Sequence, residues 1–510
     1  MISDSYKKIL VSGTILLFVG TGILPSVYGG VKGNYSGDAI SSLIPDDSLL
    51  DVQYIYNITR SLSNIVYTEY DEANGEIAKG REYGSKGERK AAEILAENMT
   101  KLGLFTKLEK IENVPLAAGC SKLTHKTDIL DYKLVITDKN SGIKEVVDCG
   151  PCPSKIGPHG KLFRTSYNFS YTGLKIRREH PNLSESKEDY VLIYGASYKP
   201  KSGDVTCGGI KFYLSCLKND LKSLRKYMFH PHFKGYICFD FNNDTHDMLH
   251  PDIASVSGPL FFINGSVGRR INNSIDDFTV DFYLNQRENK SAISYNVIGQ
   301  LNGTDSSKTV IVDCLYDCWW DQGTADAAIG MGIVMGIAKY FTDHNIKPKY
   351  NVKFIGFAGE EFGMRGALYY EAVHPREKII YVIDLNQVGF KQDYPRLQLE
   401  VVANKKTFLN EIREVVERTD YVNRTGNVTD LKLSYLKIGH ISDDRIFAVK
   451  RPLSCNTVCF LKGGPWLLHH RDGLGHTEGD VLKYFDPLDV AVTGEMVWNV
   501  TKYLAVDETL

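Results

Sequence analysis

The sequence predicts an α/β fold, in which short apolar strands alternate with helices. Three segments, 309–313, 351–357 and 379–385, have the alternating apolar, β-branched and aromatic residues that are typical of half-buried strands. Between the first two, a segment rich in Ala, Gly, Met and Ile runs from Asp326 to Phe341 and is predicted as a helix. Polar residues follow each of the three strands, and ligand sites collect at such strand ends in open α/β sheets.

Glu360 and Glu361 are the most informative pair, because they come just after the strand at 351–357. Consecutive carboxylates can divide two tasks, one binding a metal while the other handles the proton of the water bound to it. The alternative is a solvated acidic pair at a helix start, where the helix dipole favours negative charge. Asp326, near the predicted helix start, and His476, in a Gly-rich loop, make the metal interpretation the stronger one.

Five motifs in a fixed order carry the chemistry. They are Leu315-Tyr-Asp317, Gly323-Thr-Ala-Asp326, Gly359-Glu-Glu361, Asp384-Leu-Asn-Gln-Val-Gly389 and His476-Thr-Glu-Gly-Asp480. Their order and spacing resemble the secreted zinc-dependent aminopeptidases of the co-catalytic two-metal exopeptidase family. That family also contains glutamate carboxypeptidase, the transferrin receptor ectodomain and, more distantly, glutaminyl cyclase. The resemblance implies the zinc exopeptidase fold, which is a mixed, mostly parallel sheet flanked by helices.

The resemblance also implies a role for individual residues. Asp326, Glu361 and His476 match the ligands of the family's second metal, and Glu360 matches its general base. Three protein ligands and a water are the arrangement of a catalytic rather than a structural zinc site. The expected cofactor is therefore at most one zinc ion per chain.

Two departures from the family pattern affect the first metal. Its His ligand is replaced by Leu315 and its Asp ligand by Asn386. Leucine has no ligand atom, and a neutral amide is a poor replacement for a carboxylate on zinc. Asp313 and Asp384 lie two residues earlier, hence roughly 6.6 Å further back at about 3.3 Å per residue, and only a β-bulge would bring them within reach. We therefore predict that the first site is lost.

Three functions remain open at this point. The first is an extracellular one-zinc hydrolase or acyl-transfer enzyme acting on peptides, since glutaminyl cyclase shows that this fold can work with a single zinc. The second is a catalytically inactive cell-surface glycoprotein, a pseudoenzyme with a structural, adhesive, self-associating or partner-binding role, as the transferrin receptor ectodomain illustrates. The third is an active two-metal peptidase with rearranged ligands, which requires a carboxylate to reach the position of Leu315 or Asn386.

The chain is expected to have five parts. They are a signal peptide or N-terminal membrane anchor (1–30), a linker (31–45), the N-terminal part of the exopeptidase domain (46–118), an inserted β-rich protease-associated-like domain (119–290) and the C-terminal part of the exopeptidase domain (291–510). In the first part, Lys7 and Lys8 precede an apolar stretch of about 19 residues, which suits either a secretory signal or a membrane anchor. The insertion is assigned from its position and from predicted strands at 189–195 and 234–240.

Glycosylation acceptors favour export from the cell, because the sequence has thirteen Asn-x-Ser/Thr sites without an intervening proline. They are Asn34, Asn57, Asn98, Asn168, Asn182, Asn243, Asn264, Asn272, Asn289, Asn302, Asn423, Asn427 and Asn499. We therefore expect N-linked glycans and a secreted or cell-surface protein. With a formal net charge of −2 and no long run of one sign, the composition gives no reason to expect a nucleic-acid partner.

Ten cysteines in an exported chain suggest disulfides more than thiols, although their connectivity cannot be deduced. Four pairs are close enough in sequence to be local bridges: Cys149 with Cys152, Cys207 with Cys216, Cys314 with Cys318, and Cys455 with Cys459. The last of these resembles a short disulfide near the active site in some members of the family.

Overall fold

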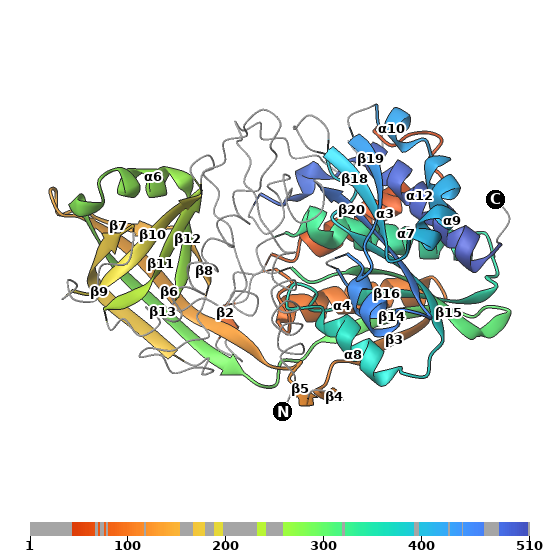
Figure 1. The fold of residues 1–510 in the computed structure, drawn as a ribbon, viewed down its shortest axis with the longest axis horizontal. Helices are drawn as coiled ribbons and strands as arrows, with labels where there is room; N and C mark the ends of the chain where they lie inside the picture. Colours follow the sequence, from red (N-terminus) through yellow and green to blue (C-terminus); the bar gives the residue numbers. More distant parts are fainter. Residues whose placement is uncertain are drawn as a thin grey trace.

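The computed structural model describes residues 43–66, 70–71, 76–77, 80–116, 119–152, 167–178, 188–196, 232–240, 259–318, 322–391, 397–426, 429–440, 442–463 and 479–507. These residues form two lobes, an α/β lobe and a β-rich lobe (Figure 1). None of the helices in these ranges is both long and apolar enough to span a membrane. The predicted signal or anchor at 1–30 lies outside the described residues.

The α/β lobe is built on a mixed eight-stranded sheet with the order β19-β18-β20-β17-β15-β16-β14-β3. In chain order its strands are β3 (Phe105–Lys110), β14 (Tyr295–Leu301), β15 (Asp305–Leu315), β16 (Tyr350–Phe357), β17 (Ile379–Asn386), β18 (Leu397–Ala403), β19 (Thr429–Tyr435) and β20 (Asn456–Gly463). The four central strands, β16, β15, β17 and β20, run parallel to one another. Strand β14 pairs antiparallel with both β16 and β3, and β18 pairs antiparallel with β20. The expected mixed, mostly parallel sheet is confirmed.

Helices cover both faces of this sheet. The buried side chains of α3 (Val52–Ser63), α4 (Lys86–Lys101), α7 (Ile329–Asp343), α9 (Lys406–Glu417) and α12 (Pro487–Ala505) belong to one large apolar core. The opposite face is covered by α8 (Arg365–Val373) and α11 (Asp444–Lys450), which pack on residues such as Ile311, Ile355 and Val382. A short α10 (Tyr421–Arg424) contacts α12 and β19. The predicted helix that ends near Phe341 corresponds to α7.

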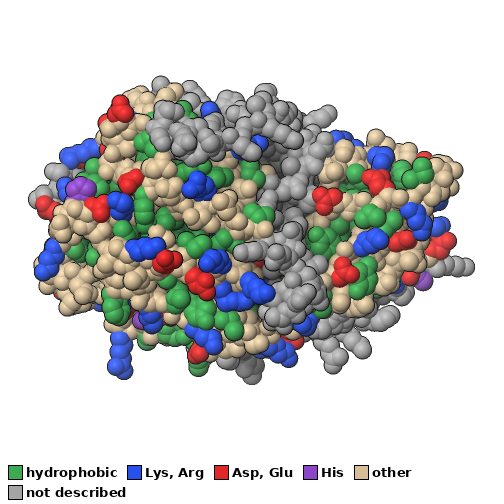
Figure 2. All heavy atoms as spheres, turned by 180° about the vertical axis from the view of Figure 1, so that it is seen from behind, with side chains coloured by type: hydrophobic (Ala, Val, Ile, Leu, Met, Phe, Trp, Pro, Cys, Tyr) green, Lys and Arg blue, Asp and Glu red, His purple; other side chains and the backbone are tan. Residues whose placement is uncertain are grey.

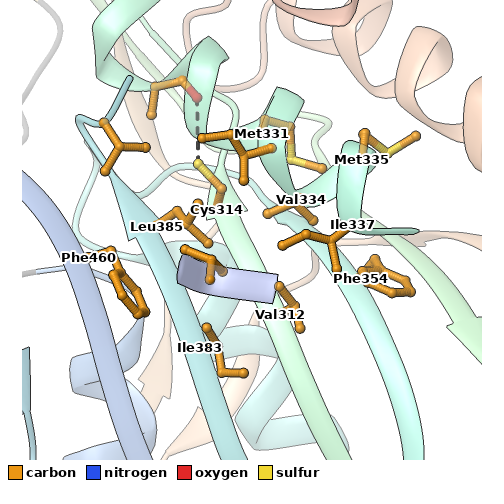
Figure 3. Close-up of a cluster of buried hydrophobic side chains, with 14 of the residues drawn as sticks. Val312, Cys314, Met331, Val334, Met335, Ile337, Phe354, Ile383, Leu385 and Phe460 are labelled. Atoms are coloured by element: carbon orange, nitrogen blue, oxygen red, sulfur yellow. Dashed lines mark hydrogen bonds between the residues drawn. The ribbon is translucent and has the colours of Figure 1, made fainter. Parts of the chain in front are cut away.

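Helix α7 lies directly on the strands that lead to the candidate site. Figure 3 shows Met331, Val334, Met335 and Ile337 of this helix over side chains of β15 and β17. Burial of so many apolar side chains is the main force that holds the helix against the sheet. The strand ends and the start of α7 are therefore fixed relative to one another.

The β-rich lobe contains a second eight-stranded sheet, with the order β7-β6-β13-β9-β10-β11-β12-β8. Its strands are β6 (Lys126–Asp138), β7 (Lys144–Val147), β8 (Cys149–Cys152), β9 (Tyr167–Arg177), β10 (Tyr190–Ala196), β11 (Phe233–Asp240), β12 (Leu260–Ile263) and β13 (Phe278–Asn289). Helix α6 (Gly265–Asn273) packs on β10 and β11. The strands predicted at 189–195 and 234–240 are present as β10 and β11. The assignment of 119–290 to a protease-associated-like domain stays a prediction.

Two minor hairpins pair β1 (Tyr70–Asp71) with β2 (Glu76–Ile77), and β4 (Val114–Leu116) with β5 (Gly119–Ser121). On the face of the molecule shown in Figure 2, acidic and basic side chains are interspersed. This distribution agrees with the nearly neutral net charge of the chain.

Candidate metal site

Buried carboxylates gather where the parallel strands of the α/β lobe end. Asp317 follows β15, Glu360 and Glu361 follow β16, and Asp326 lies in the turn before α7. The backbone N–H of Glu360 donates to Oδ1 of Asp317 over 3.0 Å, which joins the ends of β15 and β16. All four carboxylates are buried, with at most 4 % of their surface exposed. The charges of Glu361, Asp317 and Asp326 all act on Glu360, so these carboxyls lie near one another, and their role in zinc binding stays a prediction.

Asp326 lies in an irregular turn, η3 (Thr324–Ala328), that leads into α7, and its backbone angles, φ −119° and ψ 86°, are not helical. The Asp480 carboxylate accepts hydrogen bonds from the backbone N–H groups of Ala325, at 2.6 Å, and of Asp326, at 3.1 Å. The turn is preceded by Gly323, whose φ of 52° places it in the left-handed region, and a Cβ there would meet Sγ of Cys318 at 2.3 Å. Asp480, the last residue of the His476 motif, thus positions the predicted ligand Asp326.

Arg81 holds the same turn through its side chain, and the sequence analysis did not single out this residue. Its guanidinium is fully buried and donates to four backbone carbonyls, those of Leu62, Tyr316, Gln322 and Gly323, at 2.6–3.0 Å. These contacts link the loop after β15 to the turn that carries Asp326. Arg81 falls in the range 46–118, which the sequence predicts as the N-terminal part of the exopeptidase domain.

The turn after β16 presents the two glutamates. Gly359 has φ 66°, and a Cβ at this position would meet the ring of Tyr83 at 2.5 Å, so the turn requires glycine. The backbone carbonyl of Glu360 accepts from the N–H groups of Gly363, at 2.8 Å, and Met364, at 2.9 Å, before α8 begins. Glu360 and Glu361 therefore lie in a tight, hydrogen-bonded turn and not in the first turn of a solvated helix.

The crowded carboxyls shift one another's titration. Burial, together with the charge of Asp480, raises the pKa of Glu361 to about 8. Burial and then the charge of Glu361 raise the pKa of Asp317 to about 7. Burial, followed by the charges of Glu361 and Asp443, raises the pKa of Glu360 well above its usual range. Negative charge at this position is costly without a cation, so the donor chemistry of Asp326 and Glu361 fits a divalent metal.

The residues at the first metal position do not fit a metal. The Leu315 side chain is fully buried among the apolar residues of the core. Asn386 donates from Nδ2 to Oγ of Ser442 over 3.3 Å, and the next residue, Gln387, donates from Nε2 to Oδ2 of Asp326 over 2.7 Å. The Gln387 amide, which directly follows β17, therefore donates to the predicted ligand Asp326. In the family pattern, the end of this strand carries the Asp ligand of the first metal.

A β-bulge does not bring other carboxylates into that position. The pairing of β15 with β17 is continuous from Val310 through Cys314, and Asp313 stays directly opposite Asp384. The remaining predicted ligand, His476, lies outside the described residues. The structure thus describes two of the three predicted zinc ligands and the predicted general base.

Two of the local disulfides suggested by sequence spacing are absent. Cys314 is a thiol that donates to the Ala327 carbonyl over 3.5 Å, so the bridge to Cys318 is not formed. Cys455 and Cys459 are also unbridged and buried. They lie four residues apart where β20 begins, and at about 3.3 Å per residue an extended chain separates them too far for an S–S bond. The pair Cys207 and Cys216 lies outside the described residues.

Comparison with known proteins agrees with this fold and with the motif order. Residues 296–501 match the model of Peptidase family M28. A zinc aminopeptidase from Bacillus subtilis, BSAP, aligns with a TM-score of 0.57 and 16 % identity over 91 % of this chain and 97 % of its own. The aminopeptidase from Aneurinibacillus sp. strain AM-1 aligns with a TM-score of 0.52 and 14 % identity over 90 % and 95 %.

A Peptidase M28 precursor from Shewanella amazonensis aligns with a TM-score of 0.56 and 16 % identity over 90 % of this chain and 98 % of its own. At these identities the structural likeness shows the fold, whereas the family match rests on the sequence itself. A search of curated protein sequences gave no significant match. The chain therefore contains a peptidase family M28 domain, which spans residues 296–501.

Proposed function

We propose that this protein is an extracellular one-zinc enzyme of the M28 fold that hydrolyses or transfers acyl groups of peptides. The observation that carries the proposal is the asymmetry of the site. Asp326 and Glu361 keep the donor chemistry of the second metal, whereas Leu315 and Asn386 cannot hold the first. M28 membership supports a zinc cofactor and peptide substrates.

Asp326, Glu361 and His476 would hold the zinc, which when bound supplies a Lewis acid that polarises the acyl carbonyl. Glu360 is the residue suited to proton transfer, because burial and the charge of Glu361 raise the pKa of its carboxyl well above the usual range. Its turn is held by the hydrogen bond from its own N–H to Asp317. A base fixed in this way can take and return a proton without leaving the site.

Loss of the first site restricts the substrates. A second metal would clamp attacking and leaving groups together, and in an aminopeptidase it also contributes to recognition of the free substrate amine. We therefore expect weak ordinary aminopeptidase turnover, and we expect acyl-transfer substrates such as N-terminal glutaminyl peptides to be turned over better.

A second candidate is a catalytically inactive cell-surface glycoprotein that keeps the peptidase scaffold. The hydrogen bond from Gln387 to Asp326 favours this second candidate, because a neutral amide there engages an oxygen of a predicted metal ligand. Export, N-linked glycans, an N-terminal membrane anchor and self-association are part of both proposals. In support of export, none of the nine acceptor asparagines within the described ranges is buried: Asn57, Asn98, Asn168, Asn264, Asn272, Asn289, Asn302, Asn423 and Asn499.

The deciding experiment measures zinc per chain in the purified glycosylated protein and in its Asp326→Ala variant, together with hydrolysis of aminoacyl and glutaminyl peptides. A zinc ion that is lost in the variant, with turnover lost in parallel, supports the one-zinc enzyme. Equal zinc content in the two proteins, without turnover in either, supports the inactive glycoprotein. Two zinc ions that both depend on Asp326 would mean that the assignment of Leu315 and Asn386 is wrong.

A further inference from the structure

A second group of polar side chains lies deeper in the same sheet. Asp313 of β15, Asp384 of β17 and Cys459 of β20 are direct cross-strand partners in three adjacent parallel strands. Side chains of one such row point to the same face of a sheet. Leu315 and Asn386 follow two residues later on β15 and β17, so the row lies roughly 6.6 Å further from the strand ends at about 3.3 Å per residue.

This row faces α11, which contributes another carboxylate. Asp444, at the start of α11, offers a ligand atom that lies within 4.8 Å of those offered by Asp384 and Cys459, and these last two lie equally close to each other. Oδ2 of Asp444 accepts hydrogen bonds from Oγ1 of Thr457, at 3.0 Å, and from the backbone N–H of His440, at 3.1 Å. The Asp444 side chain is thus fixed in orientation, and its Oδ1 and the Oδ1 of Asp384 have no hydrogen-bond partner.

The neighbouring Asp313 is an independent indication that a cation can bind here. It is fully buried, and neither of its carboxylate oxygens has a hydrogen-bond donor, although Asp313 stands directly beside Asp384 in the row. Asp443 is fully buried with both oxygens unpartnered in the same way. Among the described residues, no Lys or Arg lies within ion-pair distance of the carboxyls of Asp313, Asp384, Asp443 and Asp444, although the charge of Arg445 acts on Asp444. An isolated buried carboxylate is costly, so these four require either protons or a cation.

We propose that Asp384, Asp444 and Cys459 bind one Zn²⁺ ion in a closed, buried site, with the Asp313 carboxylate as the fourth donor. Thiolate and carboxylate together suit Zn²⁺, whereas Ca²⁺ and Mg²⁺ are bound by oxygen donors alone. Four protein donors and complete burial are typical of a structural zinc site. The ion would tie α11 to β17 and β20, and it shares no ligand with Asp326, Glu361 and His476.

The alternative state of this cluster is a set of protonated side chains. Without a cation, burial and the charge of Asp384 raise the pKa of the Cys459 thiol, and burial raises the pKa of Asp313. Metal binding requires these groups to ionise, as it does at zinc sites in general. The two states therefore differ in a way that metal analysis detects directly.

The test uses the full chain purified without chelator. Zinc content is measured by mass spectrometry in the wild type and in Asp326→Ala, and X-ray absorption at the zinc edge is recorded on both. We expect Asp326→Ala to keep one zinc per chain that resists native dialysis against a weak chelator, with a sulfur neighbour at about 2.3 Å. Cys459→Ser should lose that zinc and its sulfur signal.

Cys314→Ser is the matched control, because Cys314 is also a buried thiol, on β15, and it donates to the Ala327 carbonyl beside α7 and not to this cluster. It should keep the sulfur-bound zinc. A zinc-free Asp326→Ala protein, or one whose zinc has only nitrogen and oxygen neighbours, overturns the proposal. Since the spectrum of the unmodified protein already shows or lacks sulfur, the test stands even if Cys459→Ser fails to fold.

The outcomes also separate this site from the proposed function, which it does not require. A sulfur-bound zinc with no Asp326-dependent zinc supports the buried site and removes the one-zinc enzyme. A single zinc per chain that is lost in Asp326→Ala supports the one-zinc enzyme and removes the buried site. A wild-type protein without zinc overturns both.

Discussion

Arg81 is a fully buried cation whose partners, in the described structure, are backbone carbonyls and not a carboxylate. Arg81→Ala would leave these carbonyls buried without donors, and each unsatisfied group costs about 1–3 kcal/mol. We predict that the variant loses about 3 kcal/mol or more of unfolding free energy, measured by urea denaturation. It should also lose the Asp326-dependent zinc, because the turn that carries Asp326 begins at the contacts with Gln322 and Gly323.

Arg413→Ala is the control for this prediction, since Arg413 forms an exposed i,i+4 ion pair with Glu417. Exposed pairs of this kind contribute about 0.5 kcal/mol or less. A loss for Arg81→Ala as small as that for Arg413→Ala would contradict the positioning role of Arg81.

Glu361 and Asp317 predict how stability depends on pH when no zinc is bound. Their folded pKa values, about 8 and about 7, exceed the ordinary values of 4.5 and 3.8. Between the ordinary and the folded values the folded chain binds more protons than the unfolded chain, so stability is fully present at low pH and is lost as pH rises. We expect unfolding free energy to fall between about pH 4 and pH 8, by an amount on the order of a few kcal/mol.

Urea denaturation of chelator-treated protein at several pH values checks this prediction. Glu361→Gln should flatten the profile, because a neutral amide cannot ionise, and added zinc should flatten the wild-type profile in the same way. A profile that rises with pH in the zinc-free wild type, or one that Glu361→Gln leaves unchanged, would show that these carboxyls do not govern it.

At the scale of elements, the contact between α3 and α7 depends on small residues. A Cβ at Gly332 would meet Oγ1 of Thr59 at 2.7 Å and the backbone oxygen of Ile55 at 3.0 Å. Alanine normally stabilises a helix interior relative to glycine, yet at this position its Cβ must push α3 away from α7. We predict that Gly332→Ala destabilises the protein by about 1–3 kcal/mol, the usual cost of overpacking.

Gly336→Ala provides the comparison within the same helix. Its Cβ would meet only the side-chain end of Ile55, at 2.7 and 2.8 Å, which can rotate away more easily than a backbone can move. Thermal denaturation should therefore rank Gly336→Ala above Gly332→Ala in stability. The reverse order would mean that α3 adapts to the larger residue.

The elements that position the candidate site were predictable because their signals are local. The strands expected at 309–313, 351–357 and 379–385 are present as β15, β16 and β17. They were predictable because the alternation of apolar residues can be recognised within each segment alone. The start of α7 was less accessible. The irregular turn that contains Asp326 depends on hydrogen bonds with Arg81 and Asp480, which are far away in the sequence.

The buried carboxylate row could not be predicted for a related reason. Asp313, Asp384 and Cys459 become neighbours only through the register of three strands, and a single sequence does not state which residues face one another across a sheet. Asp443 and Asp444 stand at the start of α11, and their burial follows from the packing of this helix on the sheet, which the sequence does not state.

At the scale of the whole molecule, a group of buried carboxyl side chains lies inside the α/β lobe, among the described residues. The net charge is only −2, and acidic and basic side chains alternate on the face shown in Figure 2. Asp313, Asp384, Asp443 and Asp444, by contrast, are fully buried without ion pairs among the described residues. These carboxyl groups are either protonated or balanced by a bound cation, and the zinc analysis of the proposed buried site distinguishes the two states.

The surface of the whole molecule carries the last prediction, which concerns glycans. Four acceptors are exposed, in both lobes: Asn57, Asn168, Asn302 and Asn423. A glycan attached to any of these side chains would extend into solvent and would not require unfolding. We predict that the chain expressed through a secretory pathway carries glycans at several of these positions, found by mass spectrometry after glycosidase treatment. Ser/Thr→Ala changes in their sequons should each remove one glycan and leave unfolding free energy within about 0.5 kcal/mol, as for other surface substitutions. A secreted chain without glycans at these sites would contradict the export that their density suggests.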